Sequence, residues 1–456
     1  MTSTTISLLI LAAYAVITLL IGLFSSRGQS SAGYLIAGRK MKIWGFVFSG
    51  VASYIGGAAI VAYSAFVYQF GITALSVFAG TAIGFLLFIP YAVKLRKKSQ
   101  EKKYLTLSDL LYEKFGKKTG SFSSVILFVV YIGILLNQFI AGSTILSHIS
   151  GMSYEYALFF SGIIITVYLV AGGFQSVVKT DIFQYLVLFV LFVLIGILSL
   201  RENTGVQMEL LDFSRFSPFM TIAFIFYGMT VVFISPEYWQ RVYAAENENV
   251  VRRGLRWSAV LIIISGFLIS IVGLTALKNI PGINGNNAFA AGLSYLLPEQ
   301  LSGLGLVILF AAIMSSADTV IFVLASAIAK DYFVSYKSVP EAGEEKNLHR
   351  NTKMFIIIIA FGGMGLAYFF RDVVTVLMFI SSLGFVILPA VLAAFHWNVS
   401  AKAVLWSFIN GLIYVMILPV LGLVNPDFAV GSFVVAGITL WFVHRFSRRE
   451  IKKREI

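Results

Sequence analysis

Four oxygen-bearing side chains lie close together in the middle of the long apolar segment 301–329. They are Ser315, Ser316, Asp318 and Thr319. In a helix, the residues at 315, 318 and 319 share one face, and Ser316 lies about 100° away from it. A carboxylate in hydrocarbon is costly, so it is expected to face an interior cavity. Several oxygens at this spacing predict a site for one small hard cation. The alternative is that the hydroxyls bond back to their own helix and only help helices to pack.

A second carboxylate, Asp181, follows Thr180 at the predicted start of helix 180–200. Two interpretations are open for it. Thr180 could cap the helix at the membrane interface while Asp181 favours the helix dipole. Alternatively, Asp181 is a cation ligand or a proton acceptor that faces the helix of Asp318.

Other polar side chains within apolar segments have simpler interpretations. Glu237 and Arg241 are four residues apart, and this spacing predicts an intrahelical ion pair near the membrane interface. Asn137, Gln138 and Gln184 are amides within predicted membrane helices. Such amides more often join neighbouring helices than contact a substrate.

The segments that must position these residues are membrane helices. Of 456 residues, 59% are hydrophobic and only 12% are charged, whereas a soluble domain has about a quarter charged residues. A crossing helix needs about 20 apolar residues. We predict an all-α polytopic membrane protein with about thirteen transmembrane helices, near 6–25, 43–69, 72–93, 121–148, 153–173, 180–200, 216–240, 257–277, 301–329, 353–370, 373–396, 403–423 and 428–446.

The distribution of basic residues predicts the orientation of these helices. The first apolar run has no Lys or Arg before it, and its first basic residue is Arg27. With thirteen crossings, 30 of the 34 Lys and Arg fall on one side of the membrane. Because basic residues concentrate in cytoplasmic loops, the N-terminus is expected outside and the C-terminus inside. The basic stretches 94–103 and 445–454 are then anchors against anionic lipid, and they do not indicate nucleic-acid binding.

Several classes of protein lack support. The chain has no cysteine and only four histidines, which stand singly, so thiolate metal sites and paired histidine sites are unsupported. There is no phosphate-cradling loop of the Walker type, so ATP-driven transport is unsupported as well. The longest polar stretches, 94–120 and 330–353, are too short for a soluble catalytic or output domain.

Two helices are predicted to break near the middle of the bilayer. The stretch 53–59 contains Gly56 and Gly57, and the stretch 223–230 contains Gly228 about five helices later. Interrupted helices at corresponding positions of two halves are typical of inverted-repeat transporters, whose site lies at the midplane. The alternative is that the small residues only allow helices to pack closely.

These residues resemble those of a known family, the sodium:solute symporters, which include sodium/glucose, sodium/proline and sodium/sialic acid symporters. The resemblance covers most of the chain. The matching segments are Tyr34–Arg39, Gly172–Phe174, Thr180–Gln184, Gln240–Arg241 with Ala244–Ala245, Ala312–Thr319 and Ala329–Tyr332.

The resemblance implies a LeuT-type core of ten helices in two inverted halves, with one helix before the core and two after it. The corresponding divisions are 1–42, 43–200, 201–397 and 398–456. It also implies a multi-pass protein of the cell membrane. This protein would not be an enzyme, and it would take up a solute together with sodium by alternating access.

The resemblance further implies a sodium site between a broken helix and an unbroken one. Its ligands would be the carbonyls of Ala52, Ile55 and Ala312 and the hydroxyls of Ser315 and Ser316. A possible second sodium would be held by Asp181, Asp318 and Thr319.

The solute is expected to be a small carboxylate or amino acid. Sugar carriers of the family have polar side chains after the first break, where this chain has Gly57-Ala58-Ala59-Ile60. Helix N-termini at a break favour an anionic group. The candidate contacts are Tyr54, Gly56, Gly57, Tyr63, Tyr227 and Thr230. Two rival functions stay open: a proton-coupled symporter that uses Asp181 or Asp318, and an intramembrane aspartyl enzyme.

Overall fold

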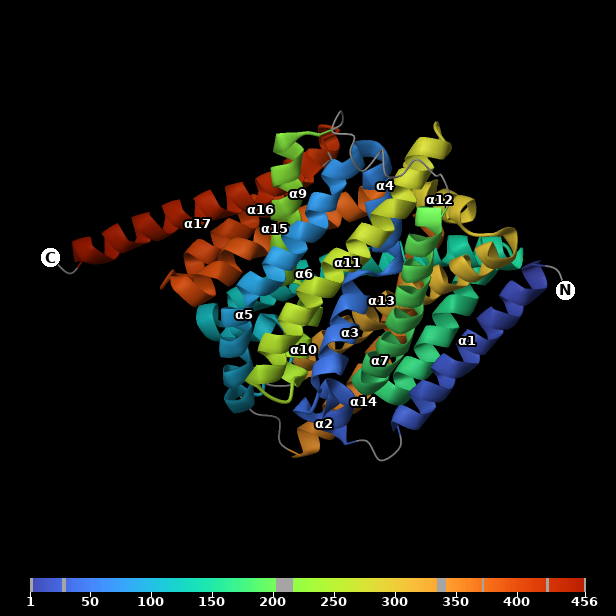
Figure 1. Cartoon of the computed structure of the whole chain (residues 1–456). Coiled ribbons are helices and arrows are strands. Elements are labelled where there is room, and N and C mark those ends of the chain that lie inside the picture. The colour runs from blue at the N-terminus through green and yellow to red at the C-terminus, as the bar shows by residue number, and fades with distance from the viewer. Residues whose placement is uncertain are drawn as a thin grey trace.

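The structure is a computed structural model that describes residues 3–26, 30–201, 216–333, 342–370, 373–423 and 426–454. The elements are almost entirely helical, and Figure 1 shows their arrangement. Some basic residues used above to predict the orientation, Arg27, Arg215, Lys337 and Arg371, lie outside these ranges. The described part of the chain is helical, as the sequence predicts.

The helices of the first half of the chain are α1 (Ser3–Ser26), α2 (Ser31–Ile36), η1 (Ala37–Arg39), α3 (Ile43–Tyr54), α4 (Gly57–Phe70), η2 (Gly71–Leu75), α5 (Ser76–Lys102), α6 (Ser108–Ser150) and α7 (Tyr154–Arg201). Those of the second half are α9 (Pro218–Ile234), α10 (Pro236–Ala244), α11 (Glu248–Asn279), η3 (Gly285–Asn287), α12 (Ala288–Leu296), α13 (Glu299–Phe333), α14 (Ala342–Phe369), α15 (Val373–His396), α16 (Ala401–Val420) and α17 (Pro426–Arg454).

Ten stretches of the described chain are long and apolar enough to cross a membrane, or eleven if the bent pair α9 and α10 forms one crossing. Three of them are much longer than one crossing needs: Ala59–Lys102 has 44 residues, Tyr154–Leu200 has 47 and Ser108–Ser147 has 40, whereas about 20 suffice. The first contains the 3-10 turn η2, and the second is kinked at Gly173, where φ is +57°. The count of thirteen crossings stays a prediction.

The predicted break in the first core helix is confirmed. Helix α3 ends at Tyr54 and α4 begins at Gly57, with Ile55 and Gly56 outside helical geometry between them. The glycines are needed because α13 passes very close. A Cβ at Gly56 would overlap the Ser316 side chain, and one at Gly57 would overlap Ile313. The glycines therefore let the unwound turn lie against α13.

The predicted position of the second break is wrong. Helix α9 runs without interruption through 223–230, and the break falls at Ser235, where the chain bends by 49° into α10. Proline explains this position, because Pro236 has no backbone N–H and disfavours helical geometry in the residue before it. Gly228 serves packing, since a Cβ there would overlap the Val77 carbonyl of α5.

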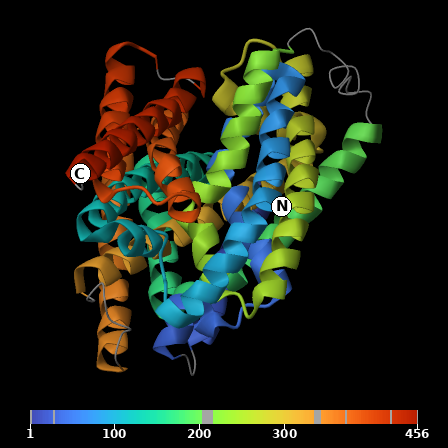
Figure 2. The ribbon, with the colours of Figure 1, turned by 90° about the vertical axis from the view of Figure 1, so that its left-hand side faces the viewer.

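Helix α13 forms the centre of the protein. Of the 18 most apolar consecutive residues in Gly303–Lys330, 94% are buried inside the protein. The corresponding shares are 22% for Phe428–Phe446 in α17 and 33% for Thr5–Ser25 in α1. Figure 1 shows α1 and α17 at opposite edges of the protein, and Figures 1 and 2 show α5, α9 and α11 side by side. The polar residues of α13 are thus surrounded by protein.

The close packing of α5 on α9 gives a test of this architecture. A Cβ at Gly80 would overlap the backbone of Ile225. We expect Gly80→Ala to destabilise the protein by about 1–3 kcal/mol, because it forces the two helices apart. The matched control is Gly362→Ala in α14, where a Cβ meets no atom within 4 Å. Thermal unfolding in detergent measures both variants, and equal melting temperatures would contradict the packing.

Candidate functional site

The break between α3 and α4 faces the two serines of α13. Ile55 is fully buried, and Ser315 and Ser316 are 1% and 2% exposed. Ser316 lies directly against Gly56, as the overlap with a Cβ there shows, and its hydroxyl is 3.5 Å from the carbonyl oxygen of Ala312. The unwound turn and Ser316, which are both predicted to hold one cation, therefore lie together.

Ser315 is oriented by a carboxylate of another helix. Its hydroxyl donates a hydrogen bond of 2.5 Å to Oδ1 of Asp181 in α7. Because the hydroxyl proton points to Asp181, the oxygen lone pairs of Ser315 are free to face a cation. The Ser315 hydroxyl thus bonds to another helix and not back to its own, whereas the Ser316 hydroxyl donates to Ala312 of its own helix, as the packing interpretation predicts.

Asp181 is not at an interfacial helix start. Helix α7 runs from Tyr154 to Arg201, and Asp181 lies two turns beyond the kink at Gly173, fully buried. Thr180 does not cap a helix end, because its hydroxyl bonds to carbonyls of the preceding turn, at Ser176 and Val177. Of the two interpretations, the position within the core favours a functional carboxylate.

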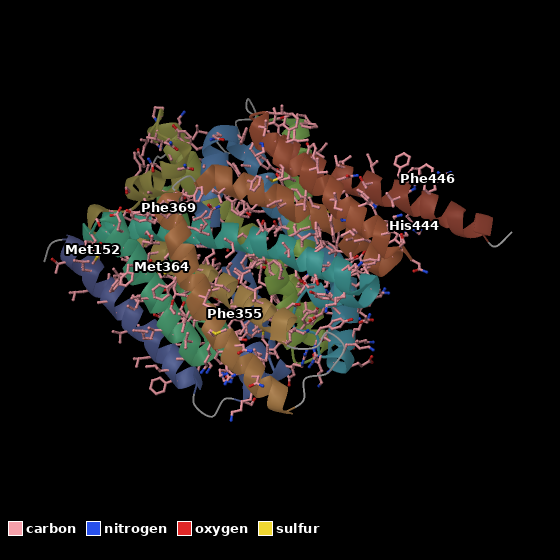
Figure 3. All side chains as sticks on the ribbon, turned by 180° about the vertical axis from the view of Figure 1, so that it is seen from behind. Met152, Phe355, Met364, Phe369, His444 and Phe446 are labelled. Carbon is pink, nitrogen blue, oxygen red and sulfur yellow. The ribbon has the colours of Figure 1, made fainter. Side chains whose placement is uncertain are left out.

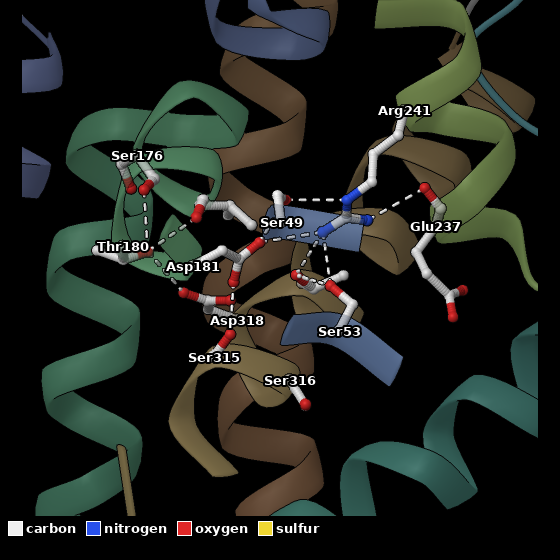
Figure 4. Close-up of polar contacts among 12 residues, drawn as sticks. Ser49, Ser53, Ser176, Thr180, Asp181, Glu237, Arg241, Ser315, Ser316 and Asp318 are labelled. Carbon is white, nitrogen blue, oxygen red and sulfur yellow. Dashed lines mark hydrogen bonds and ion pairs between the residues drawn. The ribbon is translucent and has the colours of Figure 1, made fainter. Parts of the chain in front are cut away.

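The predicted ion pair between Glu237 and Arg241 is wrong. The guanidinium of Arg241 instead pairs with Asp181, with Nη2 3.0 Å from Oδ2 and both side chains fully buried. Figure 4 shows the Glu237 carboxylate directed away from this pair, while Arg241 Nη1 donates to the Glu237 backbone carbonyl at 3.1 Å. Helix α10 starts at Pro236, and Arg241 reaches from its second turn into the core, where Asp181 needs a cation.

Two serines of α3 form further hydrogen bonds with this ion pair. Ser49 donates to Asp181 Oδ2 at 2.6 Å and accepts from Arg241 Nε at 2.9 Å. Ser53, one turn later, accepts from Arg241 Nη2 at 2.5 Å. Thr319 of α13 lies 3.3 Å from Ser53 and 3.5 Å from the guanidinium. The pair thus joins α3, α7, α10 and α13, as Figure 4 shows.

Asp318 lies on the α7 side of the same cluster. Its Oδ2 accepts hydrogen bonds from Tyr168 at 2.6 Å and from Thr180 at 3.3 Å. Its Oδ1 is buried without a hydrogen-bond partner. The cluster therefore has two buried carboxylates for one arginine, an arrangement that favours a further positive charge.

Two of the three tyrosines predicted to contact the solute, Tyr54 and Tyr63, are linked through their hydroxyls, and Tyr227 makes a separate contact. The Tyr54 hydroxyl is 2.5 Å from that of Thr81 and accepts from Tyr63 at 2.9 Å. Tyr227 is 3.2 Å from the Ser381 hydroxyl of α15. Thr230 donates back to carbonyls of its own helix, so its hydroxyl proton is already used.

Sequence reasoning missed several residues of this region. Ser49 and Ser53 had a readable signal, since they are four residues apart and precede the glycine break. Tyr168 had none. Gln138 was interpreted as packing, yet its Nε2 lies 3.3 Å from the position that a Cβ of Gly56 would take. An amide therefore borders the unwound turn.

Comparisons with known proteins agree with this geometry. The sequence pattern described as the sodium:solute symporter family matches residues 34–411. The sodium/proline symporter 2 of Staphylococcus saprophyticus is 22% identical and covers 96% of this chain and 92% of its own length. The sodium/proline symporter of Staphylococcus aureus strain JH9 is 21% identical, with 97% and 93% covered.

Two solved structures show the fold. A substrate-bound, outward-open Na⁺-coupled sialic acid symporter aligns with a TM-score of 0.80 at 19% identity and covers 98% of both chains. A nucleobase-cation-symport-1 family transporter, closed with bromovinylhydantoin bound, aligns with a TM-score of 0.58 at 13% identity, covering 92% of this chain and 95% of its own. The fold is of the LeuT type.

The buried ion pair can be tested with a double-mutant cycle. Arg241→Gln leaves Asp181 charged and unpaired, so we expect a loss of about 3–5 kcal/mol. Asp181→Asn combined with Arg241→Gln removes both charges and should recover part of that loss. Thermal unfolding in detergent measures the single and double variants. Strictly additive losses would mean that the two side chains do not interact.

Proposed function

We infer that this chain, which belongs to the sodium:solute symporter family, moves a small organic solute into the cell together with sodium by alternating access. Members of the family and the curated relatives are transporters, so the chain is a multi-pass transporter of the plasma membrane and not an enzyme. The observation that carries the proposal is the unwound turn at Ile55 held against the hydroxyls of α13, one of which is oriented by a buried carboxylate.

The proposed sodium site lies between α3 and α13. Its ligands are the carbonyl oxygens of Ala52, Ile55 and Ala312 and the hydroxyl oxygens of Ser315 and Ser316. Hard monovalent and divalent cations prefer such oxygen ligands, and a broken helix exposes carbonyls that a continuous helix would use internally. Since the ion bridges two helices, it stabilises the conformation in which they are close.

We also propose a second sodium site at Asp181, Asp318 and Thr319, which could be filled only under one condition. Arg241 contacts both Asp181 and Thr319 and supplies the positive charge there. A second sodium would therefore bind only after the guanidinium moves away. The free Oδ1 of Asp318 is the ligand that such an ion would find available.

The proposed topology keeps thirteen crossings, with the N-terminus outside and the C-terminus inside. The kink at Gly173 and the turn η2 support it, because each divides a stretch that is long enough for two crossings. The two inverted repeats would then be 43–200 and 201–397, and their broken members are α3 with α4 and α9 with α10. The segments 1–42 and 398–456 would flank this core.

The proposed solute is a small carboxylate or an amino acid. Helix α4 begins at Gly57, and its first amides would attract an anionic group. Tyr54, Gly56, Tyr63 and Tyr227 would form the remaining contacts, and Thr230 would contribute only acceptor lone pairs. The curated relatives named sodium/proline symporters support an amino acid.

The inward sodium gradient would drive the cycle. Each elementary charge that crosses the membrane gains about 2.3 kcal/mol per 100 mV. Sodium entering from outside would hold α3 against α13, and solute binding would then permit closure and inward opening. Proton coupling through Asp181 or Asp318 is the rival, and it predicts transport that follows pH and ignores sodium. The sodium-coupled relatives do not favour it.

The serines provide the direct test of sodium binding. Ser315→Ala with Ser316→Ala removes two of the proposed ligands, and we expect the sodium concentration for half-maximal stabilisation to rise at least about tenfold, which is about 1.4 kcal/mol. Thermal stability measured against NaCl, with choline chloride at equal ionic strength, reports this. The control is Ser270→Ala in α11, whose hydroxyl bonds to Gly266 of its own helix. Unchanged sodium dependence in the double variant would reject the site.

The solute class can be tested separately. Uptake into proteoliposomes with an inward sodium gradient should be measured for carboxylates, amino acids and sugars. We expect uptake of a carboxylate or an amino acid, because the first break has no polar side chains suited to a sugar. Uptake of sugars alone would refute the proposed solute, and equal uptake without sodium would refute the coupling.

A further inference from the structure

A large cavity lies beyond the candidate site, toward the C-terminal end of α13. Its volume is about 760 Å³, and its walls come from α6, α10, α13, α14 and the loop that precedes α6. Phe355, labelled on α14 in Figure 3, forms part of the wall. Lys117 lines it as well and is exposed. The cavity therefore lies at the end of the protein where the basic segments gather.

The cavity continues the face of α13 that presents Ser316. Val323 and Ala327 line it, and they follow Ser316 by seven and eleven residues, close to two and three helical turns. All three side chains thus point in nearly the same direction. Val323 is about 10 Å beyond Ser316, given a rise of 1.5 Å per residue. The proposed sodium ligand Ser316 and this part of the cavity wall therefore share one face of α13.

Three residues of the cavity wall each have a buried polar atom without a hydrogen-bond partner. Oε1 of Gln240, Oγ1 of Thr106 and Oγ of Ser124 are buried and have no hydrogen-bond partner, and all three residues border the cavity. Gln240 is only 3% exposed. Buried acceptors of this kind are normally satisfied by protein, water or a ligand. These three polar groups are exceptions in a cavity wall that is mostly apolar.

Glu237 is linked to the wall of the cavity by a hydrogen bond. It is three residues before Gln240, so the two side chains are neighbours on α10. The hydroxyl of Tyr131, which also lines the cavity, donates to the Glu237 carboxylate. Within the described part of the chain, Glu237 forms no salt bridge. Its charge lacks a positive partner, because Arg241 is committed to Asp181.

We propose that Glu237, Gln240 and Tyr131 form a monovalent-cation site at the inner cavity, a station that sodium occupies as it leaves α13 for the cytoplasm. The carboxylate supplies the charge, and Oε1 of Gln240 and the Tyr131 hydroxyl supply neutral oxygens. These are the ligand types that a hard cation prefers. Its role as an exit station rests on the proposed function, whereas the site itself is defined by its own residues.

Radiolabelled sodium tests this site without knowledge of the solute. Binding is measured at equilibrium on the purified full chain, first in a background with Ser315→Ala, Ser316→Ala and Asp318→Asn, which removes ligands of both sodium sites proposed above. We expect a residual sodium site there that binds at least about tenfold more weakly than the wild-type protein. Adding Glu237→Gln, which keeps the shape and the contact to Tyr131, should abolish this residual binding. Adding Glu237→Asp should retain it, because the charge remains.

The matched control is Glu246→Gln, which removes one exposed carboxylate from the segment after α10 and should leave residual binding unchanged. Residual binding that persists in the Glu237→Gln variant, or that is lost equally with Glu246→Gln, would overturn the station. So would the absence of any residual binding in the triple-variant background. Wild-type sodium affinity in that background would instead overturn the central site, so the two failures are distinguishable.

Discussion

The central constraint on this protein is the ion pair between Asp181 and Arg241, which are both fully buried. Two charges removed from water are tolerated only when hydrogen bonds complete their coordination. Here Ser49 and Ser53 provide these bonds from α3, and Ser315 provides one from α13. Because each of the four helices supplies a member, none can shift without leaving a charge unsatisfied. The ion pair thus ties the broken helix to α13, whose serine hydroxyls are the proposed sodium ligands.

The arrangement also explains how an unstable feature persists. An unwound turn within a membrane protein exposes backbone groups that need partners. The turn at Ile55 is surrounded by α13 on one side and by Gln138 of α6 on another. Its glycines allow this approach, and the neighbouring Ser49 and Ser53 hold α3 in place through Arg241. The helical hydrogen bonds lost at the break are therefore compensated by the contacts of Ser49 and Ser53 with Arg241.

Much of the fold followed from composition and hydropathy, since long apolar segments have few alternatives to membrane helices. The glycine pair at 56 and 57 correctly indicated the first break. The same reasoning failed at Gly228, because glycine also serves close packing and only Pro236 carried the decisive signal. The partner of Arg241 could not be predicted, since spacing along one helix favoured Glu237. Asp181 is 60 residues away in sequence, and only the tertiary structure brings it to the guanidinium.

One contact of Asp318 has a mechanical meaning. The kink at Gly173 divides α7 into two arms, with Tyr168 on the first and Thr180 on the second. Tyr168 donates to one oxygen of Asp318, and the Thr180 hydroxyl, which also bonds to carbonyls of its own helix, lies 3.3 Å from the same oxygen. A single carboxylate oxygen on α13 therefore fastens both arms at once and sets the angle between them. A rotation of either arm relative to the central helix would therefore disturb the contacts of this one oxygen.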